Sequence, residues 1–104
     1  MRPILGNYVV LEPGKPKRLR LTNPRIEERI IRDPKTGRIK TVRALVFDCI
    51  EEDGRPVSKQ FSTLSEKLAT VLWSLWEQGV LKDHVVEIVW HPMDFATEYE
   101  VRVL

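Results

Sequence analysis

One helical pattern stands between two groups of strand patterns, and this order limits the folds open to the chain. Apolar residues recur at helical spacing in residues 64–78. Three segments before this pattern and two after it have the alternation or the short apolar runs that are typical of strands. The sequence therefore predicts the element order β-β-β-α-β-β.

The first predicted strand is long and bent. It starts near Leu19, and Asn23-Pro24 is expected to change its direction. Apolar and charged residues alternate on both sides of that bend, which puts basic side chains on the outer face of the strand. The second strand, residues 41–51, is apolar on both faces over most of its length, and the third runs from Val57 to Phe61.

Turn signals connect these strands. The segment Asp33-Pro34-Lys35-Thr36-Gly37 has an aspartate, a proline and a glycine where a turn favours them. Asp53-Gly54 indicates a two-residue hairpin. A fourth strand is expected from Val85 to Trp90, and residues 91–97 form a loop that leads to a fifth, cleanly alternating strand.

The helix is expected to start at a capping box, Thr63-Leu64-Ser65-Glu66, with Thr63 as the N-cap. It should end near Gln78, because Gly79 is a favourable residue just after a helix. The predicted core face carries Leu64, Leu68, Val71, Leu72 and Leu75. Trp73 lies away from that face, which indicates either a partner contact or cover by the N-terminal segment.

Five strands with one helix between the third and the fourth favour a mostly β fold, the five-stranded OB-fold barrel. An open α+β sheet with the helix across one face is the alternative. The chain has 104 residues, enough for one domain. We expect residues 1–17, which are rich in proline, to form an N-terminal arm or extra strand, and residues 18–104 to form the OB-fold domain.

Charge is distributed unevenly along the chain, although the formal net charge is only +2. Most of the basic residues precede residue 44, and acidic residues predominate after it. A basic half on a nearly neutral chain indicates a surface for a negatively charged partner. The alternative is a solvated face that meets the acidic half within the fold.

Four stretches of the chain carry a resemblance to a known family: DPKTG, KTVRALVFD, EEDGRPVSKQFSTLSEKLA and FATEYEVRV. They resemble the small single-domain OB-fold proteins of phages, archaeal mobile elements and related genomes, which are similar to single-stranded DNA-binding proteins. The resemblance covers about residues 18–104 and implies an OB-fold that binds single-stranded DNA. The chain departs from the family at Trp90-His91-Pro92, where a glycine-containing turn with a basic residue is expected.

In an OB-fold, the ligand lies across the second and third strands, between the loop that joins strands one and two and the loop that joins strands four and five. Phosphates require positive charge along a backbone, and bases require flat partners. The first loop is basic, and the second contains or adjoins aromatic residues. The expected nucleic-acid-binding residues are Arg32, Lys35, Arg38, Lys40, Arg43, Lys59, Trp90 and Phe95. Trp90 is also a candidate for the core, since it shares a strand face with Val86 and Ile88.

Little in the sequence favours catalysis or metal binding. His84 and His91 are distant from Cys49 in the sequence, and no spacing resembles a zinc site. The serines near the helix start are explained as caps, and there is no glycine-rich phosphate loop. We therefore expect a protein that is not an enzyme and that uses no metal and no small-molecule cofactor.

Composition also bears on location and partners. There is no apolar run long enough to span a bilayer and no secretory signal, and the single cysteine fits a reducing compartment, so we expect a cytoplasmic protein with no membrane partner. Few amides among many charged residues are typical of a thermophile. The expected partner is single-stranded DNA, with RNA as a further possibility. The alternative is a protein-interaction or homo-oligomeric module that uses Trp73 and the N-terminal arm.

Overall fold

The computed structural model describes residues 8–93 and 97–104, and the chain is mostly β with one helix, as the sequence predicts. The elements are β1 (Lys17–Arg32), β2 (Ile39–Glu52), β3 (Arg55–Thr63), α1 (Glu66–Glu77), β4 (Val86–His91) and β5 (Glu98–Val103). With 12 residues, α1 is too short to cross a membrane, and no other helix occurs in the described ranges.

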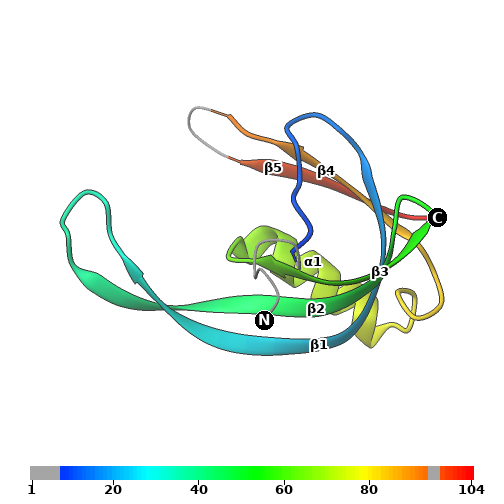
Figure 1. The fold of residues 1–104 in the computed structure, drawn as a ribbon, viewed down its shortest axis with the longest axis horizontal. Helices are drawn as coiled ribbons and strands as arrows, with labels where there is room; N and C mark the ends of the chain where they lie inside the picture. Colours follow the sequence, from blue (N-terminus) through cyan, green and yellow to red (C-terminus); the bar gives the residue numbers. More distant parts are fainter. Residues whose placement is uncertain (1–7, 94–96) are drawn as a thin grey trace.

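The strands form one antiparallel sheet in the order β3-β2-β1-β4-β5 (Figure 1). β1 is central, because it pairs with β2 along most of its length and with β4 from Lys17 to Leu19. β3 and β5 are the outer strands, and within the described residues no ladder joins them. The sheet curls but is not closed.

Residues 8–14, which we call the arm, run across the opening between β3 and β4. The backbone N–H of Val9 donates to the carbonyl of Gln60 at 2.9 Å, and that of Gly14 donates to the carbonyl of Trp90 at 2.8 Å. Gly14 has a φ of +72°, a conformation that favours glycine, and there the chain turns towards β1. The arm thus links the two halves of the open sheet.

β1 bends at Asn23, as the Asn23-Pro24 signal predicts. Asn23 has a φ of +54°, and the β1–β2 register shifts between Thr22 and Arg25. Beyond this point β1 pairs with β2 alone, and β2 pairs with β3 only from Leu45 onwards. The two strands therefore leave the body of the protein as a projecting two-stranded hairpin (Figure 1).

The core lies between the inner face of the sheet and α1. The largest fully buried side chains of this core are Phe47, Leu19, Leu68, Leu72, Leu81, Ile88 and Val86. Trp76 of α1 packs edge-on against Phe47, with ring centroids 6.3 Å apart and planes at 69°. Full burial of such a side chain contributes about 1.5–3 kcal/mol, so this layer is the main source of stability.

The helix begins two residues later than the capping-box interpretation predicts. The Oγ of Ser65 accepts the backbone N–H of Leu68 at 3.2 Å, so Ser65 is the N-cap. The hydroxyl of Thr63 instead accepts the N–H of Ser65. Leu64 therefore precedes the helix and is 51% exposed, and Val71 is 43% exposed, so the prediction that both lie on the core face is wrong. The helix ends at Gln78, and Gly79 follows with a φ of +77°, as predicted.

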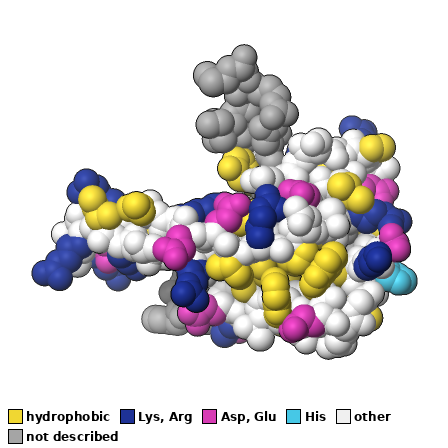
Figure 2. Space-filling view, turned by 90° about the horizontal axis from the view of Figure 1, so that it is seen from below, with side chains coloured by type: hydrophobic (Ala, Val, Ile, Leu, Met, Phe, Trp, Pro, Cys, Tyr) yellow, Lys and Arg dark blue, Asp and Glu magenta, His cyan; other side chains and the backbone are white. Residues whose placement is uncertain are grey.

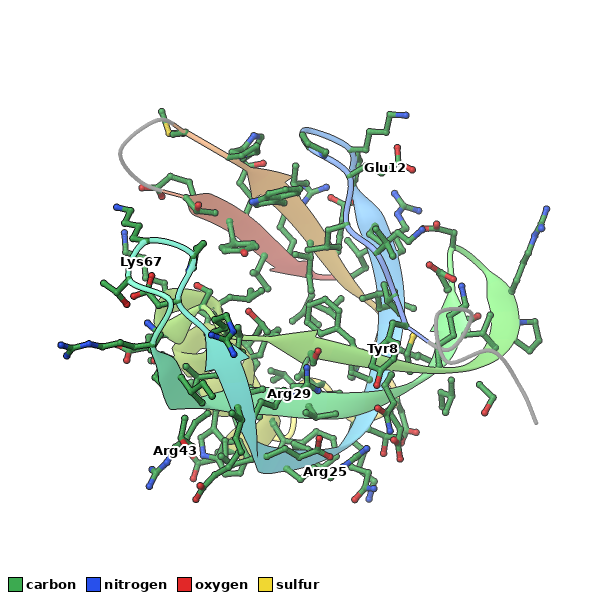
Figure 3. All side chains as sticks on the ribbon, turned by 60° about the vertical axis from the view of Figure 1, so that its left-hand side comes forward. Tyr8, Glu12, Arg25, Arg29, Arg43 and Lys67 are labelled. Atoms are coloured by element: carbon green, nitrogen blue, oxygen red, sulfur yellow. The ribbon has the colours of Figure 1, made fainter. Side chains whose placement is uncertain are left out.

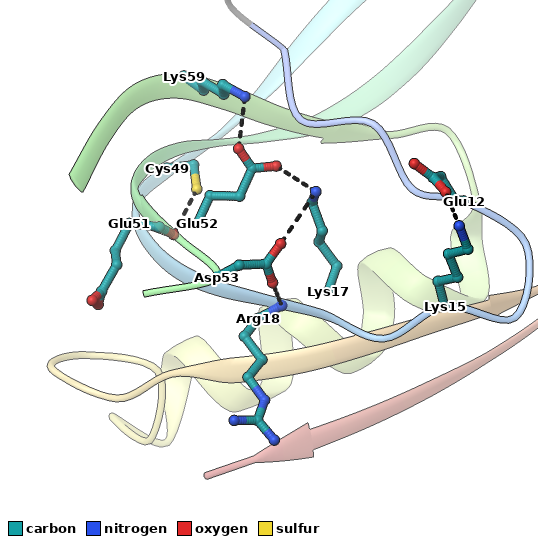
Figure 4. Close-up of polar contacts among 9 residues, drawn as sticks. All are labelled: Glu12, Lys15, Lys17, Arg18, Cys49, Glu51, Glu52, Asp53 and Lys59. Atoms are coloured by element: carbon teal, nitrogen blue, oxygen red, sulfur yellow. Dashed lines mark hydrogen bonds and ion pairs between the residues drawn. The ribbon is translucent and has the colours of Figure 1, made fainter. Parts of the chain in front are cut away.

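A cluster of ion pairs holds the start of β1 against the β2–β3 turn (Figure 4). The carboxylate of Glu52 accepts Lys17 Nζ at 2.8 Å and Lys59 Nζ at 2.6 Å. Burial acts to raise the pKa of Glu52, but the two lysine ammonium groups outweigh it and hold the pKa below its usual value. The pKa of Asp53 is lowered mainly by the backbone N–H of Arg18, which donates to its carboxylate at 2.9 Å.

These lowered pKa values predict an acid-sensitive fold. The stability contributed by Glu52 and Asp53 is complete above their ordinary pKa values of 4.5 and 3.8, and it is lost as the pH falls through the lower folded-state values. Glu52→Gln should reduce the free energy of unfolding at pH 7 by about 1–3 kcal/mol and weaken its acid dependence. Urea unfolding at several pH values measures both effects. Glu28→Gln, at an exposed position of β1, is the control, and equal losses in the two variants would contradict the prediction.

Candidate functional site

The tip of the β1–β2 hairpin, residues 32–43, carries five basic residues and one acid, and we call it the basic hairpin. Its turn is closed by hydrogen bonds from the N–H of Gly37 to the carbonyl of Asp33 and from the N–H of Asp33 to the carbonyl of Arg38, both 2.8 Å. The Asp33 carboxylate accepts the N–H of Lys35 at 2.8 Å. Asp33, the only acid of the segment, is thus used to form the turn.

The cations of the basic hairpin are exposed. They are Arg32, Lys35, Arg38, Lys40 and Arg43. Within the described residues, none of them has a carboxylate oxygen within 4.0 Å. Arg32 donates to the carbonyl of Gly37 at 2.9 Å, and Arg43 is directed outward from the ribbon (Figure 3). Their positive charge is therefore available to a partner.

Basic side chains elsewhere in the described residues are mostly paired with acids. The paired cations are Lys15, Lys17, Arg18, Arg20, Arg25, Arg29, Lys59, Lys67 and Arg102. Arg18 and Arg102, for example, both contact Glu87, at 3.2 and 2.8 Å. Outside the basic hairpin, Arg55 and Lys82 are the described cations with no such pair. Several of these pairs join the basic half of the sequence to the acidic half, whereas the cations of the basic hairpin have no such partner among the described residues.

The hairpin presents charge on both of its faces. Arg43 shares a face with Ile26, because the register pairs Ile26 with Leu45 and side chains alternate along a strand. Lys40 lies on the opposite face by the same alternation. Positive charge that surrounds a ribbon suits a flexible polyanion, which can contact it along several paths.

Lys59 is placed elsewhere. Its ammonium contacts Glu52 at 2.6 Å in the ion-pair cluster near the β2–β3 turn. The register pairs Lys59 with Cys49, whereas Thr63, at the hairpin end of β3, pairs with Leu45. The structure therefore does not bring Lys59 together with the basic hairpin, and its part in ligand binding stays a prediction.

Trp90 is half-buried and lies at the edge of an open pocket of about 310 Å³, which we call the seam pocket. The arm, the end of β3 and the facing ends of β4 and β5 enclose it, and its lining includes Val9, Leu11, Phe61, Ser62, Trp90 and Tyr99. Phe95, the other expected stacking residue, lies outside the described residues. The basic hairpin and the ends of β4 and β5 that flank residues 94–96 lie on the same side of the molecule (Figure 1).

Two residues near this pocket were not among the expected site residues. Tyr99 lies in the alternating fifth strand, and it is half-buried beside Trp90, its register partner. Arg29 lies on the face of β1 opposite to Ile26, which is the less exposed face of the strand beyond the bend, and its Nη1 donates to Ser62 Oγ at 3.4 Å (Figure 3). Alternation alone indicates the face on which each residue lies, but the contact with Ser62 depends on how β1, β2 and β3 pair.

Trp73 lies in a second open groove, of about 340 Å³, between α1 and the sheet. Trp73 is 38% exposed and its neighbour Ile26 is 54% exposed. Apolar side chains gather on this side of the body (Figure 2). The sequence left two interpretations for Trp73, a partner contact and cover by the N-terminal segment. Residues 8–17 do not cover Trp73, because they run along β3 and β4 instead.

Cys49 is fully buried. Burial raises the pKa of its thiol, and Sγ donates to the carbonyl of Glu51 at 3.2 Å. A thiol in this environment is a poor nucleophile at neutral pH. Residues 8–93 and 97–104 contain no group of three or more His, Cys, Asp or Glu side chains that could hold a metal ion.

Comparison with known proteins finds no matching family model, no matching curated protein and no matching solved structure. The functional assignment therefore depends on the geometry of the chain itself.

Proposed function

We propose that the chain is a non-catalytic OB-fold domain that binds single-stranded nucleic acid, with single-stranded DNA as the preferred ligand. The strand order supports the fold, because β1 pairs with both β2 and β4 and the helix lies between β3 and β4. An OB-fold is a five-stranded and partly open barrel. In this chain the arm occupies the opening.

The observation that carries the proposal is the contrast between the paired cations of the body and the unpaired cations of the basic hairpin. The phosphates of a flexible polyanion can contact such a ribbon on either face, and counterions are released when the polyanion binds. Isolated surface ion pairs contribute little to stability, so the pairing on the body has its main effect on where the remaining charge lies.

The proposed contacts divide by chemistry. Arg32, Lys35, Arg38, Lys40 and Arg43 bind phosphates, and Lys59 adds a contact when the ligand displaces it from Glu52. Trp90 and Phe95 stack on bases, a contact worth about 1–3 kcal/mol per base. Phosphate contacts and base stacking distinguish poorly between different bases, so the proposed binding has no strong sequence preference.

Binding should depend strongly on salt. Each phosphate that is neutralised contributes about −0.7 to the slope of log K against log salt for a single strand, so five contacts give a slope of about −3.5. Fluorescence anisotropy with a labelled oligo-dT at several salt concentrations measures the slope. Unlabelled duplex DNA and oligo-U serve as competitors. A flat salt dependence, or preference for the duplex, would contradict the proposal.

Charge reversal on the hairpin should weaken binding more than the same reversal elsewhere. We expect the double variant Lys35→Glu/Arg38→Glu to lose at least tenfold in affinity, because it replaces two phosphate contacts by repulsion. Arg55→Glu/Lys82→Glu is the matched control, since it changes the net charge equally at cations that also lack a carboxylate partner. Equal losses in the two double variants would show that net charge, and not the hairpin, determines affinity.

The exposed Trp73 supports a second candidate function, a homo-oligomeric assembly module. Trp73 and Ile26 form an apolar surface of the kind that protein interfaces bury. On this alternative, light scattering should show a dimer of the wild-type chain at micromolar concentration and a monomer for Trp73→Ala. Met93→Ala, at an exposed apolar residue outside the groove, is the control. A monomeric wild-type chain would remove this alternative.

A further inference from the structure

The seam pocket is an apolar space at the place where the sheet fails to close. Its volume is about 310 Å³. A cavity of about 150 Å³ is sufficient to hold benzene. The pocket is therefore large enough for a planar ring system such as a nucleobase, and it is open to solvent on one side.

Two aromatic rings line the pocket. Trp90 of β4 and Tyr99 of β5 are register partners, so their side chains lie next to each other on the same face of the sheet. Both residues are half-buried, in contrast to the fully buried Ile88, which lies on the same face of β4 two residues before Trp90. The rings thus keep accessible surface on the pocket side, where a flat ligand can stack.

A guanidinium contacts one of the residues that line the pocket. Ser62 lines the pocket, and its Oγ accepts a hydrogen bond from Arg29 Nη1 at 3.4 Å. The second contact of Arg29 is a long one, 3.7 Å from Nη2 to Glu27 Oε1. An apolar peptide side chain also fits an apolar pocket, but a cation next to a lining residue favours a ligand that carries a negative charge near its flat ring.

The pocket lies at the hairpin end of the sheet. The register pairs Thr63, another of its lining residues, with Leu45, and β2 leaves the body for the hairpin at Leu45. Trp90 and Tyr99 lie next to the β4–β5 connection, on the same side of the molecule (Figure 1). A single strand that contacts the basic hairpin can therefore continue to the pocket.

We infer that the seam pocket accepts one unstacked nucleobase of the bound strand, which stacks on Trp90 and Tyr99 while Arg29 contacts its phosphate. This inference rests on the proposed function and adds a specific subsite to it. The arm is part of that subsite, because Val9 and Leu11 form one wall of the pocket.

Photocrosslinking of the wild-type chain tests the inference directly. An oligo-dT with 5-bromodeoxyuridine in place of thymidine is bound, irradiated and digested, and the crosslinked residues are identified by mass spectrometry. We expect crosslinks at Trp90 or Tyr99. Crosslinks confined to other residues, with binding intact, would overturn the pocket and leave the proposed function standing. No binding of the oligonucleotide at all would overturn both.

Affinity measurements provide an independent test. Tyr99→Leu should lower the affinity for oligo-dT about tenfold, the effect of one lost stacking contact, and Tyr99→Phe should retain it because the ring remains. Trp73→Leu, which removes an aromatic ring from the groove between α1 and the sheet, is the matched control and should bind like the wild type. Thermal unfolding verifies that all three variants are folded. Equal affinities for Tyr99→Leu and Tyr99→Phe would count against the subsite.

Discussion

The bend of β1 at Asn23 is the constraint on which the rest of the structure depends. Before the bend, β1 lies in the body, where Leu19 and Leu21 are buried and β4 pairs alongside. After it, the strand has β2 as its one partner and leaves the core. A residue in the left-handed region followed by a proline produces this change of direction without ending the strand. The bend thereby separates the hairpin from the acids of the body.

That separation explains the distribution of charge. Cations near the core meet carboxylates from β2 and β4, as Arg20 meets Glu51 and Arg18 meets Glu87. The cations of the basic hairpin, further out on the ribbon, have no carboxylate oxygen within 4.0 Å among the described residues. Like charges held close together on such a ribbon repel one another, and a polyanionic partner relieves that repulsion. A projecting hairpin with no apolar core of its own also has little stability by itself, so its conformation can adapt to a ligand.

Local signals in the sequence predicted the parts of the structure that depend on local chemistry. Asn23-Pro24, Asp53-Gly54 and Gly79 all act where their residue types indicate, with positive φ values at Asn23, Asp53, Gly54 and Gly79. The predicted start of the helix was wrong, because Thr63 and Ser65 are both good N-cap residues and only packing selects between them. The Glu52 contact of Lys59 and the seam pocket could not be predicted, since they depend on a β2–β3 register shift and on the course of the arm.

The arm has a further consequence for the outer edge of β3. The carbonyl of Gln60 on that edge accepts the N–H of Val9, so part of the edge already has a partner from the same chain. An uncovered sheet edge is a template for pairing with other molecules, and it is a common starting point for aggregation. The arm therefore covers part of this edge against pairing with other molecules. It does so with a segment that also carries Val9 and Leu11 against the core, so the same few residues both protect the edge and extend the apolar packing.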